Sequence, residues 1–272
     1  MFIDAHAHVD RYQRIGEGGL DSALAEIAEF KILTISNSMD IPSYDKNLSI
    51  SQNNDYIVPI FGIHPWNASE FADRLETLTP HVATSPMLGE IGLDFFFVED
   101  QQKYADQFTV FEYFLSSAKE QNKVVHVHTK GAEEAVYELL LAYSLPRVLI
   151  HWYSGPIPTL MKFIDLGAYF TLGIEVNYSE HLKHIAQLIP LQRILTETDN
   201  PGGPKSYIGK PGMPSLLFEV IKVLALIRGM QEKDFVNNVH SNLLAFIGDD
   251  PRLERTKFML EESSSRTINS SG

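Results

Sequence analysis

The sequence predicts an α/β fold, a (β/α)8 TIM barrel, from three observations. The chain has 272 residues, close to the roughly 250 of a typical barrel, and its apolar fraction of 44% can fill a large core. Eight short runs rich in apolar and β-branched residues recur along the chain, and segments with helical periodicity separate them. Strands that alternate with helices indicate parallel strands joined by helical crossovers.

Each of the eight runs is short and mostly apolar, as expected for a strand buried on both faces of a parallel sheet. The predicted strands are residues 2–8, 32–36, 57–62, 86–91, 124–128, 148–151, 168–173 and 193–198. A doubly wound open sheet is the alternative for such a pattern, but no Gly-rich phosphate-binding loop follows the first run.

Four of the separating segments have the periodicity of amphipathic helices. In residues 101–121, for example, Phe111, Leu115 and Ala118 fall on one face. The other three segments are residues 132–141, 214–228 and 233–246. We expect one domain over residues 1–260 and a Ser-rich, polar and disordered tail over residues 261–272.

The composition argues against several classes of protein. The chain has no cysteine, which excludes disulfides and thiolate metal ligands and suits a cytoplasmic protein. We expect no membrane span and no signal peptide, because no apolar run reaches 18 residues and charged residues interrupt the N-terminal segment. The net charge of −13, from 22 basic and 35 acidic residues, disfavours broad binding to a nucleic acid backbone. A nuclease remains compatible, because bound divalent cations can offset phosphate charge locally.

Two pairs of histidines have the spacing of side chains on one face of a strand. His6 and His8 lie in the first predicted strand, and His126 and His128 lie in the fifth. Side chains at positions i and i+2 point to the same side, so each pair can aim at one point. In the fifth strand we prefer His128 as a ligand because it lies nearer the C-terminal end. His126 would then pack one layer deeper, and the opposite assignment stays open.

Further polar side chains end or follow other predicted strands, where the active sites of barrel enzymes lie. These are His64, Glu90, His151 and Asp199. Nitrogen and oxygen ligands of this kind suit Zn, Mn, Fe or Mg. Five or more such groups converging inside a barrel would carry a large desolvation cost without a cation, so the pattern predicts a metal site.

Six motifs, in this order, resemble those of the TatD family of metal-dependent hydrolases, within the amidohydrolase-like barrels. The resemblance extends from residue 4 to about residue 246, nearly the whole chain. The motifs are Asp4-Ala-His-Ala-His-Val-Asp10, Gly62-Ile-His-Pro65, Gly89-Glu-Ile-Gly-Leu-Asp94, His128-Thr-Lys-Gly-Ala132, His151-Trp-Tyr-Ser-Gly155 and Glu197-Thr-Asp-Asn-Pro201.

The resemblance implies a binuclear metal centre with two divalent ions that share Glu90. The first site would consist of His6, His8, Glu90 and Asp199. The second would consist of Glu90, His128 and His151. Lys130 stands where the family usually has Arg two residues after this histidine, and this alignment supports His128 over His126.

At such a centre, two ions lower the pKa of a water toward about 7 and polarise the scissile group. We expect Asp199 to act as the general base. His64 is not an expected ligand, and we assign it to hydrogen-bonding the substrate or stabilising the transition state. Two lysines could contact a phosphate, and three aromatic residues could stack on a base. They are Lys130, Lys210, Trp66, Trp152 and Tyr153.

The leading hypothesis, implied by the resemblance, is an exonuclease-type deoxyribonuclease that hydrolyses phosphodiester bonds of DNA. Three departures from the motifs concern the substrate: Lys130 lacks the bidentate fork of Arg, Gly212 replaces an expected Asn, and Trp152-Tyr153 replaces Cys-Phe. One alternative is a metal-dependent hydrolase of a small amide, ester, lactone or phosphoester. Another is a non-catalytic barrel, which the intact ligand positions disfavour. We expect no membrane association and no obligate protein partner.

Overall fold

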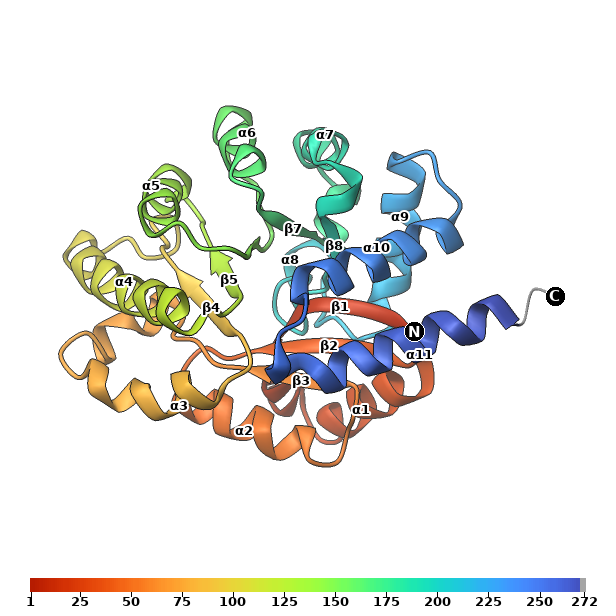
Figure 1. Ribbon diagram of the computed structural model, residues 1–272, viewed down its shortest axis with the longest axis horizontal. Helices are drawn as coiled ribbons and strands as arrows, with labels where there is room; N and C mark the ends of the chain where they lie inside the picture. The colour runs from red at the N-terminus through yellow and green to blue at the C-terminus, as the bar shows by residue number, and fades with distance from the viewer. Residues whose placement is uncertain (270–272) are drawn as a thin grey trace.

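A computed structural model of the protein describes the backbone of residues 1–269 and side chains as far as Ser263. Eight strands lie at the centre of this described part, with helices around them (Figure 1). The strands are β1 (Phe2–Ala7), β2 (Ile32–Asn37), β3 (Ile57–Ile60), β4 (Leu88–Gly92), β5 (Val125–His128), β6 (Val148–Ile150), β7 (Tyr169–Leu172) and β8 (Ile194–Thr196). The predicted strands are confirmed, and their ends agree to within two residues.

The strands run parallel and in chain order, which is the arrangement of a (β/α)8 barrel. One parallel set is β1-β2-β3 and the other runs from β4 to β8. A parallel bridge just beyond β3 joins the two sets. On the other side, the Asp199 amide donates to the His6 carbonyl (2.9 Å) and the His8 amide to the Asn200 carbonyl (2.8 Å). These bonds bring the ends of β1 and β8 together, and the predicted fold class is confirmed.

The helices form the outer layer of the barrel (Figure 1). The α-helices are α1 (Gly19–Phe30), α2 (Ile41–Ser51), α3 (Thr79–Thr84), α4 (Tyr104–Gln121), α5 (Glu133–Tyr143), α6 (Ile157–Asp165), α7 (Glu180–Leu188), α8 (Lys205–Ile208), α9 (Leu216–Ile227), α10 (Glu232–Ile247) and α11 (Glu254–Asn269). The 3₁₀ helices are η1 (Val9–Ile15), η2 (Pro65–Glu70), η3 (Leu75–Leu78), η4 (Gln101–Lys103), η5 (Ile174–Asn177), η6 (Leu191–Arg193) and η7 (Pro251–Leu253). No helix in residues 1–269 is both long and apolar enough to cross a membrane.

The four segments with helical periodicity are helices in the structure, as α4, α5, α9 and α10. In α4 the buried side chains include Phe111, Leu115 and Ala118, which recur at the spacing of one helical face and pack on the barrel. The helix ends before Asn122, whose left-handed backbone (φ 51°) is one that asparagine tolerates.

The C-terminal segment differs from the expectation of a disordered tail over residues 261–272. Helix α11 continues through residues 261–269, and residues 270–272 lie outside the described residues. Leu260 is fully buried, and the amino group of Met1 donates to the Ser263 hydroxyl (3.1 Å). The helix therefore packs beside the N-terminus, as Figure 1 shows, through contacts that the local polar composition does not reveal.

The chain just beyond the end of β3 approaches β4 closely at the position of Glu90. A Cβ on Gly62 would lie 2.4 Å from the Gly89 carbonyl carbon and 2.5 Å from the Glu90 nitrogen. A Cβ on Gly89 would lie 2.6 Å from the Cβ of His126. Glycine at both positions lets the backbone that carries Glu90 sit against its neighbours.

We predict that Gly62→Ala destabilises the fold by about 2 kcal/mol or more, because backbone atoms must move to admit the methyl group. Gly202→Ala is the matched control, since its Cβ would meet no atom within 4 Å. Equilibrium urea unfolding of the two variants measures the difference. Equal midpoints would contradict the close approach of this segment to β4.

Candidate metal centre

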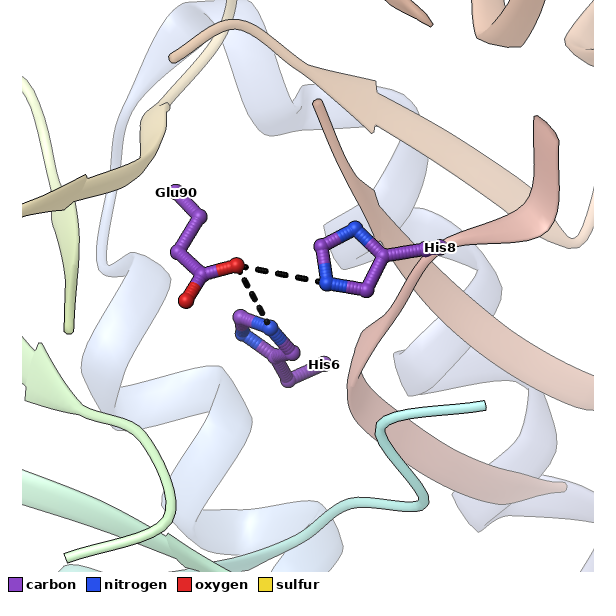
Figure 2. Close-up of side chains that lie close together, drawn as sticks. All are labelled: His6, His8 and Glu90. Atoms are coloured by element: carbon purple, nitrogen blue, oxygen red, sulfur yellow. Dashed lines mark ion pairs between the residues drawn. The ribbon is translucent and has the colours of Figure 1, made fainter. Parts of the chain in front are cut away.

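The site is built around Glu90, which β4 places inside the mouth of the barrel. His6 lies in β1 and His8 directly follows that strand. Figure 2 shows that both rings point at one oxygen of this carboxylate. His6 Nε2 lies 3.4 Å and His8 Nε2 lies 3.2 Å from Glu90 Oε2. The i, i+2 spacing thus does bring both imidazoles to one point, and all three residues are buried.

Asp199, which follows β8, completes this first group. Its Oδ1 lies 3.3 Å from His8 Nε2 and 3.8 Å from His6 Nε2. Asp199 has a left-handed backbone (φ 49°), a conformation that Asp adopts more readily than most residues. Its side chain is 19% exposed, whereas those of His6 and Glu90 are 0% and 2% exposed. Asp199 is therefore the member of this group that an incoming molecule can reach most easily.

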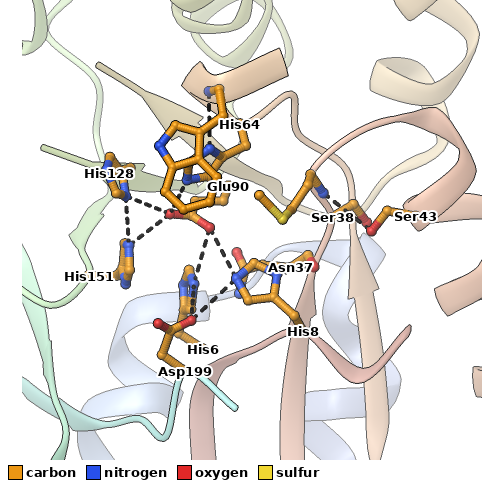
Figure 3. Close-up of polar contacts among 12 residues, drawn as sticks. His6, His8, Asn37, Ser38, Ser43, His64, Glu90, His128, His151 and Asp199 are labelled. Atoms are coloured by element: carbon orange, nitrogen blue, oxygen red, sulfur yellow. Dashed lines mark hydrogen bonds and ion pairs between the residues drawn. The ribbon is translucent and has the colours of Figure 1, made fainter. Parts of the chain in front are cut away.

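The other oxygen of Glu90 faces a second group of nitrogens (Figure 3). His128 Nδ1 and His151 Nε2 each lie 2.8 Å from Glu90 Oε1, and these two nitrogens are 3.2 Å apart. The structure therefore brings together the six residues expected from the resemblance, with one oxygen of Glu90 toward each set. This arrangement suits a carboxylate that bridges two cations.

In three of the histidines, the ring nitrogen that points away from Glu90 contacts a hydrogen-bond acceptor. His8 Nδ1 contacts the Asn37 carbonyl (3.1 Å). His128 Nε2 contacts Asp94 Oδ2 (3.0 Å), and His151 Nδ1 contacts Glu197 Oε2 (3.3 Å). A carbonyl or carboxylate oxygen can only accept, so each neutral ring carries its hydrogen on that outer nitrogen. The inner nitrogen then keeps its lone pair for a cation.

His6 supplies an independent test of whether these residues fit a cation. Its ring is fully buried, and neither ring nitrogen has a hydrogen-bond partner within the described residues. The ring stacks on that of His151, with centroids 3.8 Å apart. Buried polar atoms are rarely left without a partner, so a cation beside His6 Nε2 would account for its burial.

His64 has the opposite arrangement of hydrogens. Its Nδ1 accepts from the Trp66 amide (3.2 Å), so the hydrogen of the neutral ring is on Nε2, which lies 3.3 Å from Glu90 Oε1. Burial lowers the pKa of His64 to about 4, and the ring is therefore neutral near pH 7. His64 presents a donor to the centre rather than a lone pair, which agrees with its expected role toward substrate.

His126 does not reach the centre. Both of its ring nitrogens are buried without a hydrogen-bond partner within the described residues, and its ring lies 6.0 Å from that of Phe246. Burial, together with the nearby His6 and His151, holds the pKa of His126 well below its usual value. His128 is thus the fifth-strand histidine that contacts Glu90, and His126 packs deeper in the barrel.

The pKa shifts follow from the burial of these charges. Burial alone lowers the pKa of His8, but its contacts with Asp199 and Glu90 outweigh this and raise it to about 10. The pKa of His151 is raised well above its usual value, where Glu90 and Glu197 likewise outweigh burial. Burial would raise the pKa of Glu90, but the surrounding histidines hold it well below its usual value. Without a cation, protons on the inner nitrogens therefore balance the carboxylates.

Two carboxylates, Asp94 and Glu197, orient the ligands His128 and His151. Both stand in the motifs, but the sequence alone did not indicate a function for them. Asp94 also accepts from Trp66 Nε1 (2.8 Å) and from two backbone amides. Burial raises its pKa, but these contacts and that with His128 lower it to about 2. Glu197 also accepts from the Trp152 amide (2.9 Å) and the Thr171 hydroxyl (2.8 Å). A carboxylate ending an apolar strand is the signal that could have identified them.

The metal centre opens into a cavity of about 550 Å³ at the C-terminal ends of the strands. Lys130 lines it, and its Nζ donates to the Ser154 hydroxyl (2.8 Å) and lies over the ring of Phe96. Lys210 does not line the cavity, contrary to expectation. It is exposed beyond the end of α8, and Lys205 at the start of that helix faces the cavity instead.

The three aromatic residues expected at the mouth divide into two groups. Trp66 and Trp152 line the cavity, and Trp66 is 46% exposed. Tyr153 is only 1% exposed, and its hydroxyl donates to the Pro156 carbonyl (2.7 Å). Tyr153 therefore packs in the core and cannot stack on a base, which corrects the expectation.

The structure explains one departure from the family motifs. A Cβ on Gly212 would lie 1.8 Å from Asn200 Oδ1, so the side chain of Asn200 fills the space beside residue 212. The side-chain amide of Asn200 therefore occupies the space that a side chain at position 212 would take.

Comparison with known proteins agrees with this geometry. The family model for TatD-related DNases matches residues 3–248. The chain belongs to the TatD-related DNase family. Escherichia coli K12 YcfH, an uncharacterized metal-dependent hydrolase, is 26% identical over 252 residues, covering 89% of this chain and 94% of YcfH. Escherichia coli K12 YjjV, described in the same way, is 27% identical over 238 residues, covering 84% of this chain and 90% of YjjV.

A crystal structure of YjjV, a TatD homolog, has a TM-score of 0.82 and 24% identity, covering 90% of this chain and 97% of that one. A TatD family hydrolase from Entamoeba histolytica has a TM-score of 0.76 at 18% identity, with coverage of 90% and 97%. These likenesses show the fold. Together with the family match, they make this TatD-family barrel a metal-dependent hydrolase.

We predict that cation binding at pH 7 releases protons. The raised pKa values of His8 and His151 mean that both rings are protonated in the ion-free protein at this pH, whereas a ligand must be neutral. Calorimetric titration with Mn²⁺ in buffers of different ionisation enthalpy measures the release, and affinity should rise with pH between about 6 and 8. His184→Gln, at an exposed histidine of α7, is the control. Heats that do not depend on the buffer would contradict the prediction.

Proposed function

We propose that the protein hydrolyses phosphodiester bonds of single-stranded DNA at two divalent cations held around Glu90. The observation that carries the proposal is the charge of the cavity. Glu90 and Asp199 are its only carboxylates among the described residues, and both belong to the metal cluster. The other charged lining residues are all cationic, in a chain of net charge −13, and are Arg11, Arg14, Lys130 and Lys205.

This distribution of charge favours a phosphate-containing substrate. Lysine and arginine contacts supply much of the affinity of proteins for nucleic acid backbones. A neutral lactone or amide would gain little from a cationic wall, on which Lys130 and Lys205 line the cavity of the metal centre alone, and Arg11 and Arg14 lie at its edge, where a second hollow begins. The cavity therefore favours the deoxyribonuclease hypothesis over the small-molecule alternative, and the description of the matched family as DNases supports the same choice.

Aromatic side chains on the cavity favour unpaired bases. Trp66 and Phe97 line it with ring centroids 5.8 Å apart, and Phe97 is 58% exposed. Trp152 and Tyr207 form a second aromatic group, with centroids 6.1 Å apart. Exposed rings of this kind stack on bases at about 1–3 kcal/mol per base, and only unpaired bases offer their faces.

The residues fit two cations, one beside each oxygen of Glu90. His6, His8 and Asp199 would hold the first, and His128 and His151 the second, with Glu90 shared. Bound there, divalent cations lower the pKa of a water and polarise a phosphoryl group.

We assign to Asp199 the role of taking the proton of the attacking water. Its pKa lies below the usual value, because contacts with His8 outweigh the effect of burial, so the carboxylate is ionised at neutral pH. It is also more exposed than His6, His8 or Glu90. A general base of this kind contributes about 100-fold to 10,000-fold to rate.

In this proposal, His64 and Lys130 act on the substrate's oxygens. The Nε2–H of His64 points toward the centre and can donate to a phosphoryl oxygen as negative charge develops. Lys130, held by Ser154, offers a point charge at the cavity wall.

We predict that Asp199→Ala lowers the rate of DNA hydrolysis by about 100-fold or more while the fold is retained, because the proton acceptor is lost. The assay follows end-labelled single-stranded DNA on a gel with Mg²⁺, Mn²⁺ or Zn²⁺, and circular dichroism checks the fold. Asp73→Ala, at an exposed aspartate outside the cavity, is the matched control, and a chelator removes the metal.

Stepwise shortening that stops in Asp199→Ala and with chelator supports the proposal. Full turnover by Asp199→Ala would contradict the assignment of Asp199 as the general base. DNA left intact by the wild-type protein in every metal would overturn the proposed substrate and favour a small phosphoester or lactone, which a substrate panel would then identify.

A further inference from the structure

A second hollow of about 440 Å³ adjoins the cavity of the metal centre. Its wall shares four residues with that cavity, so the two are neighbours along one surface. The shared residues are Arg11, Arg14, Met39 and Trp66. The rest of the second hollow lies between η1 and the start of α2, and leads away from the metal cluster.

Arg11 and Arg14 form the boundary between the two hollows. They are three residues apart in η1, and a 3₁₀ helix has 3.0 residues per turn, so both side chains leave the same side. Helix η1 begins directly after His8, which fixes the arginines relative to the metal cluster. Neither forms an ion pair with another described residue, although the chain has 35 acidic residues.

The charges of the second hollow leave these arginines available. Lys46 adds a third cation, and two carboxylates, Asp10 and Asp40, also line it. Asp40 is committed elsewhere, since Oδ1 accepts from the Ser43 amide (2.8 Å) and Oδ2 from the Asn67 amide group (3.4 Å). Asp10 lies beside both arginines without forming an ion pair, so three cations face two carboxylates in this hollow.

Trp66 gives the same boundary a flat apolar surface. Its indole is held by the Nε1 hydrogen bond to Asp94 (2.8 Å), and 46% of the residue is exposed. A guanidinium group can form two parallel hydrogen bonds to a phosphate, and the fixed indole beside it can stack on a base. Together these groups suit one nucleotide.

We propose that Arg11 and Arg14 bind the phosphate of the nucleotide next to the scissile bond, and that the strand continues into the second hollow. The proposal rests on the proposed function and specifies the substrate as an oligonucleotide rather than any phosphodiester. A longer strand then gains contacts that a minimal diester cannot make.

The test compares two substrates, thymidine 5′-p-nitrophenyl phosphate and the hexanucleotide (dT)6, with the full chain and Mn²⁺. In the variant Arg11→Gln/Arg14→Gln, we expect kcat/KM for (dT)6 to fall about 10-fold or more, because charge-assisted hydrogen bonds to phosphate are lost. For the small diester we expect a change below about twofold, since it has no second phosphate. The slope of log Kd for (dT)6 against log salt should change by about 0.7, because contact with one phosphate is lost.

The matched control is Arg255→Gln/Lys257→Gln. It removes the same charge from α11, where neither residue lines either hollow, and should leave both substrates unaffected. If the double variant at residues 11 and 14 fails to fold, Arg14→Gln alone carries the test, because Arg14 is exposed. About half the change in salt slope is then expected.

Equal losses on both substrates, or no loss on (dT)6, would overturn the subsite while leaving the proposed function intact. Equal efficiency of the wild-type protein on the small diester and on (dT)6 would also overturn the subsite and leave the proposed function intact. A wild-type protein that cleaves neither would overturn the proposed function and this inference together.

Discussion

The buried carboxylate of Glu90 is the constraint on which the rest of the site depends. Removing an ionised carboxylate from water costs several kcal/mol unless opposite charge and hydrogen bonds replace the water. Its two oxygens face ring nitrogens from five histidines at distances of 2.8–3.4 Å. Four of these rings can present lone pairs inward, and that arrangement is stable when a cation, or protons in its place, supplies the positive charge. The close approach of Gly62 and Gly89 lets the backbone hold Glu90 there.

Charges of opposite sign occupy different places around this centre: carboxylates contact the ligands, and cations line the cavity wall. The protein is acidic as a whole, yet the cavity wall beyond the metal cluster carries only cations among the described charged residues. Acidic groups close to the ligands are used to orient them: Asp94 holds His128, and Glu197 holds His151. The net negative charge of the chain is therefore compatible with the proposed phosphate substrate, because the cations line the cavity of the metal centre.

Much of the fold and the candidate ligands could be predicted from the sequence because they follow from short-range patterns, whereas the division of the ligands between two cations came from the resemblance to the TatD family. Strand and helix periods gave the barrel, and the spacing of His6 and His8 put two rings on one side. What the sequence could not give depends on contacts between distant segments. Which nitrogen of His64 carries the hydrogen depends on the Trp66 amide, and the exclusion of Tyr153 depends on its burial. That Lys205 and not Lys210 lines the cavity depends on the course of one loop. Arg11 and Arg14 lie in a 3₁₀ helix in which Val9, Tyr12 and Ile15 recur every third residue. Seven residues are too few for this period to predict a helix from the sequence.

We infer that the groups around Glu90 act by holding two cations. The most direct measurement is hydrolysis of single-stranded DNA by metal-free protein as Mn²⁺ is added in steps, with bound metal counted in the same samples. Activity should be absent at the start and should saturate at two equivalents, and Glu90→Gln should bind fewer and stay inactive. Hydrolysis without metal, or two bound equivalents with Glu90→Gln as active as the wild-type protein, would contradict the claim.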